Sequence, residues 1–309
     1  MKPALLIVLG LAVLPVGAAG APTGVARSAA DCSIKSTGLV PLTDLSGRRT
    51  YHGHRGGLYP GGINRPPRAY LQQGLAAARR VRPINGRIVL LSIGMSNATQ
   101  EFNPFIALAH QDPALSPAVR LVDGAVGGWD ARRIARPAAG YWRAVDRRIA
   151  AEGATGREVQ AVWLKTAIWG EDRAFPADAR ALQSNLRSIV RILIGKYPNL
   201  RLIYVSSRTY AGYAVTPLNP EPAAYDGGFA VRWLIQDRMQ RRLRGPWIGW
   251  GPYLWTDGEK GRGDGLTWMC GDVRRDGTHP SAAGAGKVAR LLLTFFKSDP
   301  TAKSWFAAG

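Results

Sequence analysis

Short apolar runs of strand length alternate with longer segments of helical spacing, and this alternation restricts the fold more than any other feature of the chain. The expected strands are residues 87–93, 119–122, 159–164, 200–206 and 247–250. The expected helices are residues 69–81, 99–110, 139–151, 176–196, 223–243 and 281–296. Strands that are apolar throughout and joined by helical crossovers are typical of a parallel sheet covered by helices on both faces. We therefore predict a three-layer α/β/α fold.

The N-terminal residues 1–21 have the composition of a secretory signal peptide, because one Lys precedes an apolar run that small residues follow. An uncleaved membrane anchor is the alternative, although residues 5–16 are short for a bilayer span. We expect residues 22–85 to form an irregular arm and a first helix, and residues 86–309 to form the main domain. The predicted location is secreted or periplasmic.

The chain has two cysteines, Cys32 and Cys270. Both lie in the exported part, where disulfides persist, so we expect them to form a bridge; two free thiols are the alternative. Two distant cysteines and four histidines give no metal-site spacing, so we expect no metal.

Lys and Arg number 41 against 21 acidic residues, which gives a formal charge of +20. A polyanion partner is one interpretation, and basic residues spread over solvated faces are the other. No basic run is longer than a pair such as Arg132-Arg133, and no nucleic-acid-binding motif is visible. We therefore expect no nucleic-acid partner, and at most peripheral contact with anionic surfaces.

Three polar residues stand in loops at the predicted carboxyl ends of strands, where parallel sheets place their sites. Ser96 follows the strand at residues 87–93, and Asp276 and His279 share a tight loop before the last helix. A serine nucleophile needs a base, and the base needs an orienting carboxylate. The alternatives are a helix-capping Ser, a capping Asp and a structural His.

A glycine-rich loop follows the strand at residues 119–122 and contains Gly127 and Gly128. Glycine lets a backbone N–H approach a substrate oxygen closely, which suits an oxyanion hole. An ordinary turn is the alternative.

Together these loops resemble the SGNH/GDSL hydrolase family over about residues 86–297. The nucleophile block of that family, Gly-Asp-Ser, is matched here by Gly94-Met95-Ser96, and its final Asp-x-x-His by Asp276 and His279. An α/β-hydrolase would show G-x-S-x-G, with its acid well separated from its His.

The resemblance implies a flavodoxin-like sheet with Ser96 as nucleophile, His279 as base and Asp276 as its orienting group. The backbone N–H groups of Ser96 and Gly128 would bind the oxyanion, with Gly127 as the neighbouring choice. No cofactor is implied.

The family's third block, Gly-x-Asn-Asp, has no counterpart after the strand at residues 159–164, so one oxyanion donor is missing. Lys165 and Thr166 carry the side-chain donors nearest that place, and Lys165 is the predicted substitute. A structural Lys165 and a weaker oxyanion hole are the alternative.

Four aromatic residues between positions 247 and 268 could stack on sugar rings or pack in the core: Trp250, Tyr253, Trp255 and Trp268. Export and these aromatics favour O-acyl esters of carbohydrate, such as an acylated polysaccharide, as the substrate. A catalytically weak or inactive carbohydrate-binding module on the same fold is the alternative function.

Overall fold

The computed structural model describes Met1 and residues 29–45 and 49–308, so the predicted signal peptide lies outside the described residues apart from Met1. Its centre is a five-stranded parallel sheet with the order β4-β3-β5-β6-β7. The strands are β3 (Ile88–Gly94), β4 (Val119–Asp123), β5 (Val159–Lys165), β6 (Leu202–Val205) and β7 (Trp247–Trp250). Every residue of β3, β5, β6 and β7 is buried. The prediction of a parallel sheet from continuous apolar runs is therefore confirmed.

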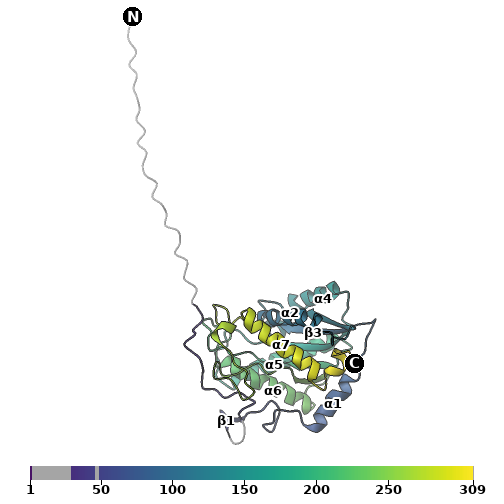
Figure 1. Cartoon of the computed structure of the whole chain (residues 1–309), viewed down its shortest axis with the longest axis horizontal. Coiled ribbons are helices and arrows are strands. Elements are labelled where there is room, and N and C mark those ends of the chain that lie inside the picture. Colours follow the sequence, from purple (N-terminus) through teal and green to yellow (C-terminus); the bar gives the residue numbers. More distant parts are fainter. Residues whose placement is uncertain (2–28, 46–48, 309) are drawn as a thin grey trace.

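Helices cover both faces of this sheet, as Figure 1 shows. On one face α2 (Ser96–His110) packs against α7 (Ala282–Ser298), with α1 (Arg68–Ala78) beside β7. Because connections between parallel strands are right-handed as a rule, α4 (Gly140–Ala151), α5 (Ala177–Lys196) and α6 (Ala223–Met239) lie on the other face. The remaining elements are short: β1 (Thr50–Tyr51), β2 (His54–Arg55), α3 (Ala131–Ile134), η1 (Cys270–Asp272) and α8 (Lys303–Phe306). The result is a three-layer α/β/α fold with the strand order of flavodoxin-like sheets.

The segments that precede β3 pack into the same core as the sheet. Leu42 is fully buried, and its backbone N–H donates to the Tyr253 hydroxyl at 3.1 Å. In α1, the Tyr70 hydroxyl donates to the Ile248 carbonyl on β7 at 2.7 Å. The N-terminal segment and α1 are therefore held by the edge of the sheet that lies farthest from β4.

Several helix boundaries differ from the sequence-based prediction by one to four residues; α1, for example, ends at Ala78 rather than at residue 81. The first turn of α2 begins at Ser96 rather than at residue 99, so Ser96 belongs to the helix that follows its strand. The helix α6 ends at Met239, four residues before the predicted end. Among the described residues, no helix combines the length and apolar character that a bilayer crossing needs.

Cys32 and Cys270 form a disulfide, with their Cα atoms 5.5 Å apart and a sequence separation of 238. The bridge ties the N-terminal segment to the loop that precedes α7. Because it closes a long loop, its loss should lower the free energy of unfolding by about 2–5 kcal/mol.

We expect no titratable thiol in the unreduced, denatured protein and two after reduction. Urea unfolding of the Cys32→Ser/Cys270→Ser variant measures the stability change. Two thiols in the unreduced protein would contradict the bridge.

Candidate active site

The loop after β3 presents Ser96 at the carboxyl edge of the sheet. Gly94 ends the strand, Met95 is the extended N-cap of α2, and the partly exposed Ser96 opens the helix. A Cβ at position 94 would lie 2.1 Å from the carbonyl oxygen of Lys165 on β5. Only glycine fits there, and this close approach of β3 and β5 fixes the turn that positions the serine.

His279 and Asp276 face Ser96 from the loop that precedes α7. Ser96 Oγ lies 2.8 Å from His279 Nε2, and Nδ1 of the same ring lies 2.5 Å from Asp276 Oδ2. The second carboxylate oxygen, Oδ1, accepts the backbone N–H groups of Thr278 and His279, each at 3.0 Å. The structure thus brings together the three residues that the sequence selected, within hydrogen-bonding distance of one another.

The carboxylate of Asp276 is electrostatically suited to orient the imidazole. Burial acts to raise the pKa of Asp276, but the hydrogen bonds from His279 and Thr278 outweigh it and hold this pKa below its usual range. An ionised Asp276 accepts Nδ1–H of His279 and leaves Nε2 free to accept the Ser96 hydroxyl proton. The arrangement can therefore activate the serine as a nucleophile.

The glycine-rich loop after β4 contacts the serine. A Cβ at Gly127 would lie 3.7 Å from Ser96 Cβ, and Gly128 has a positive φ of 82°. In the described part of the chain, the backbone N–H groups of Ser96 and Gly128 have no hydrogen-bond acceptor. Two free N–H groups on loops that meet at the serine form an arrangement that can bind an oxyanion.

Asp123, the last residue of β4, holds this loop in place. Its carboxylate accepts the Ser92 hydroxyl at 2.6 Å, the Ala125 N–H at 3.0 Å and the Thr99 hydroxyl. Arg148 on α4 donates to the carbonyl oxygens of Asp123 and Ala125, at 2.9 and 2.6 Å. This network was not predicted from the sequence, although an acidic residue at a strand end was an available signal.

The structure corrects the prediction for Lys165, which does not supply the missing oxyanion donor. Its Nζ donates to both carboxylate oxygens of Glu101, each at 2.5 Å, and the two side chains are 1% and 0% exposed. A buried ammonium needs a counter-charge, which Glu101 supplies from the inward face of α2. Burial lowers the pKa of Lys165 to about 8; Glu101 opposes this shift and Arg208 adds to it. The hydroxyl of Thr166 is buried without a hydrogen-bond partner in the described residues.

Two further residues, Asn97 and Arg208, hold the loop that carries His279. Asn97 Nδ2 donates to the Thr278 carbonyl oxygen at 2.9 Å, and Arg208 Nη2 reaches the same oxygen at 3.4 Å. Both side chains are almost fully buried. Burial lowers the pKa of Arg208, while Glu101, Glu221 and Asp276 oppose this. Arg208 follows β6 at the same sheet edge. A charged residue just after a predicted strand could have indicated its place near the site.

The aromatic residues proposed to stack on sugar rings are core residues instead. Trp250, Tyr253, Trp255 and Trp268 are 5%, 4%, 0% and 2% exposed. Their burial removes them from any substrate surface and corrects that interpretation. A different indole, that of the partly exposed Trp129, directly follows Gly128.

A cavity of about 380 Å³ adjoins this glycine-rich loop, and Trp129, Arg133 and Arg136 contribute to its lining. Arg133 donates to the Gly128 carbonyl oxygen at 2.9 Å, which connects the cavity wall to the loop beside Ser96. The cavity therefore offers an aromatic surface and two cationic side chains at the end of the loop that carries Gly128.

No protein-family model and no curated protein matches the chain. Solved structures that match include a Bacillus subtilis protein at 16% identity and a TM-score of 0.39, over 70% of this chain and 57% of that one. A GDSL-like lipase from Bacteroides thetaiotaomicron matches at 8% identity and a TM-score of 0.39, over 73% of this chain and 95% of that one.

A mutant of an acetyl-xylooligosaccharide esterase from Geobacillus matches at 16% identity and a TM-score of 0.40, over 69% of this chain and 96% of that one. The chain spans little more than half the length of the Bacillus subtilis protein. Independently of these matches, the strand order β4-β3-β5-β6-β7 is the flavodoxin-like order that the resemblance of the loop motifs implied.

Proposed function

We propose that this protein is a carboxylic ester hydrolase that uses Ser96 as its nucleophile. The observation that carries the proposal is the continuous set of contacts from Ser96 Oγ to His279 Nε2, at 2.8 Å, and from His279 Nδ1 to Asp276, at 2.5 Å. A hydroxyl, an imidazole and a carboxylate in this order form the machinery of acyl transfer in serine hydrolases.

In the proposed reaction, Ser96 Oγ attacks the ester carbonyl carbon while His279 Nε2 takes the hydroxyl proton. The N–H groups of Ser96 and Gly128 bind the oxyanion of the tetrahedral intermediate. The carbon–oxygen bond to the alcohol then breaks, and His279 gives its proton to the leaving alkoxide. A water molecule attacks the acyl-enzyme with His279 again as base, which releases the acid and restores Ser96.

O-acyl esters of carbohydrate are the substrate class that we propose. The support is the cavity beside Gly128, because an accessible indole such as that of Trp129 offers a flat apolar face to a sugar ring. Arg133 and Arg136 on the same wall would donate hydrogen bonds to the oxygen atoms of the sugar. We also propose that the protein is located outside the cytosol. The Cys32–Cys270 bridge supports this location, because disulfides persist in oxidising compartments.

The substrate proposal is tested by Trp129→Ala, assayed on acetylated xylo-oligosaccharide and on p-nitrophenyl acetate. We expect kcat/KM for the saccharide ester to fall about fivefold or more, which corresponds to roughly 1 kcal/mol of lost contact. The small aryl ester has no sugar ring to stack on the indole, so its kcat/KM should stay the same. Equal losses on both substrates would contradict a saccharide site at Trp129. If the wild-type protein hydrolyses neither ester but binds the saccharide, the alternative of a binding module holds.

A further inference from the structure

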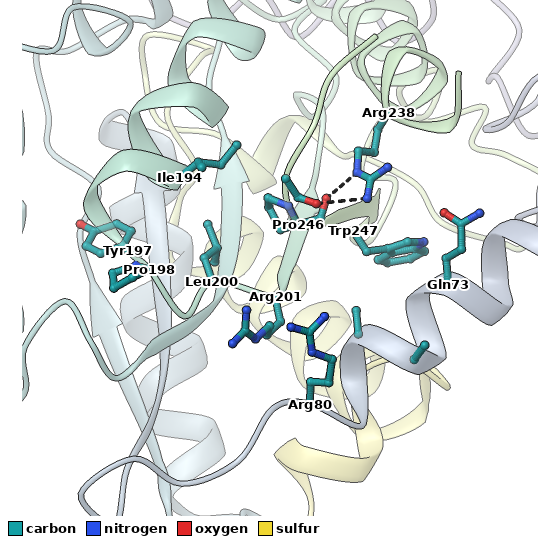
Figure 2. Close-up of a pocket in the computed structure, with 13 residues that line it drawn as sticks. Gln73, Arg80, Ile194, Tyr197, Pro198, Leu200, Arg201, Arg238, Pro246 and Trp247 are labelled. Atoms are coloured by element: carbon teal, nitrogen blue, oxygen red, sulfur yellow. Dashed lines mark hydrogen bonds between the residues drawn. The ribbon is translucent and has the colours of Figure 1, made fainter. Parts of the chain in front are cut away.

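A second cavity, of about 460 Å³, lies at the sheet edge opposite Ser96 (Figure 2). It forms where β6 and β7 begin, next to the ends of α1 and α5. Ser96 follows the carboxyl end of β3, and all five strands are parallel, so the sheet separates this cavity from the candidate active site. Arg80, Arg201 and Arg238 line it, and no Asp or Glu does so among the described residues.

The three arginines differ in their hydrogen bonds. Arg238 donates to the carbonyl oxygens of Pro246 and Gly245, at 2.8 and 3.1 Å. By contrast, the Nε of Arg201 is buried and has no acceptor within the described part of the chain. Figure 2 shows the guanidinium groups of Arg80 and Arg201 side by side with no interaction drawn to either. Within the part of the chain that the structure describes, the guanidinium groups of Arg80 and Arg201 therefore have no acceptor and can bind a ligand.

The electrostatics of this pair favour an anion. Burial, and then the nearby charge of Arg80, lower the pKa of Arg201, so the two cations repel each other. A buried guanidinium N–H without an acceptor is costly, and an anion between the two groups would remove both penalties. Paired guanidinium groups match the oxygens of phosphate and sulfate, which they bind in a bidentate manner.

We propose that Arg80 and Arg201 form a binding site for a tetrahedral oxyanion, phosphate or sulfate, either free or carried by a polymer. Leu200 and Trp247 contribute apolar surface to the lining of the same cavity. The formal charge of +20 would raise the local concentration of such anions. The proposal is independent of the ester-hydrolase function, because the sheet lies between the two sites.

The test is isothermal titration calorimetry of the full chain with sodium sulfate and sodium phosphate, at constant ionic strength set with sodium chloride. We expect saturable binding of one anion per chain. The Arg80→Gln/Arg201→Gln variant should bind at least about tenfold more weakly, since two charge-assisted contacts are lost. Arg290→Gln, which removes one charge from the exposed surface of α7, is the control and should bind as the wild type does.

Dextran sulfate distinguishes the source of the oxyanion. If it displaces inorganic sulfate from the wild type, and the double variant loses this competition, the site accepts polymer-borne groups. If only inorganic anions compete, the site binds a free anion. Equal affinity of the wild type and the folded double variant for sulfate and phosphate would overturn the proposal and assign the binding to diffuse surface charge. Because the ester-hydrolysis rate on p-nitrophenyl acetate is measured separately, failure of one proposal leaves the other intact.

Discussion

Replacing Ser96 by Ala should lower kcat for hydrolysis of p-nitrophenyl acetate by about 10⁴-fold or more while the protein stays folded. The hydroxyl contacts His279 Nε2 at 2.8 Å and lies at the start of α2 beside Gly127. Without it His279 has no nucleophile to activate. Any remaining rate would come from oxyanion stabilisation and substrate binding.

The matched control is Ser184→Ala on the exposed surface of α5, which should hydrolyse the ester at the wild-type rate. Circular dichroism melting of both variants shows whether a lost rate reflects chemistry or unfolding. A folded Ser96→Ala variant that keeps most of its activity would mean that another residue is the nucleophile, and the proposed mechanism would be wrong.

The buried charges behind the serine predict a second large effect, this time on stability. Glu101 is the anion that faces the two buried cations Lys165 and Arg208. Replacing it by Gln leaves both cations without that counter-charge, and we expect the free energy of unfolding to fall by about 3–5 kcal/mol. Lys165→Met should cost less, because the nearby positive charge of Arg208 still stabilises the Glu101 carboxylate. Urea unfolding of the two variants measures the difference.

The same variants test the corrected role of Lys165. If its ammonium only balances Glu101, Lys165→Met should keep kcat within a fewfold of the wild-type value at temperatures where both proteins are folded. A loss of about 10²-fold or more, the size expected for one oxyanion donor, would restore Lys165 to the oxyanion site. An equal loss of stability in Glu101→Gln and Lys165→Met would contradict the charge balance described here.

Local patterns were sufficient to predict the sheet and its helices. The runs at Ile88–Gly94 and Val159–Lys165 are apolar almost throughout because strands in the middle of a parallel sheet are buried on both faces. The ends of the helices could not be predicted as closely. The helix α2 begins at Ser96 because the chain turns directly from Gly94 into the helix, and no residue type in the sequence marks that start. The burial of Trp255 and Trp268 depends on segments distant in sequence, so composition could not reveal it.

The residues of the candidate active site could likewise be predicted from the sequence only in part. Ser96, Asp276 and His279 could be selected because loops at the carboxyl ends of parallel strands converge, and because Asp and His stand three residues apart. The partner of Lys165 could not be selected, since an ion pair between β5 and α2 has no spacing in the sequence. One signal did exist: Glu101 stands among Ala98, Phe102 and Phe105 on the buried face of α2, where a carboxylate needs a partner.

The most direct test of the central claim is the mass of the protein after exposure to diisopropyl fluorophosphate. The serine oxygen attacks phosphorus, a phosphorus–oxygen bond forms and fluoride leaves, so an activated serine gains one diisopropylphosphoryl group. We predict a single adduct per chain on the peptide that contains Ser96, with ester hydrolysis lost in proportion, and no adduct on Ser96→Ala. An adduct on a different residue, or an unmodified Ser96 in protein whose ester hydrolysis has been abolished, would contradict Ser96 as the nucleophile.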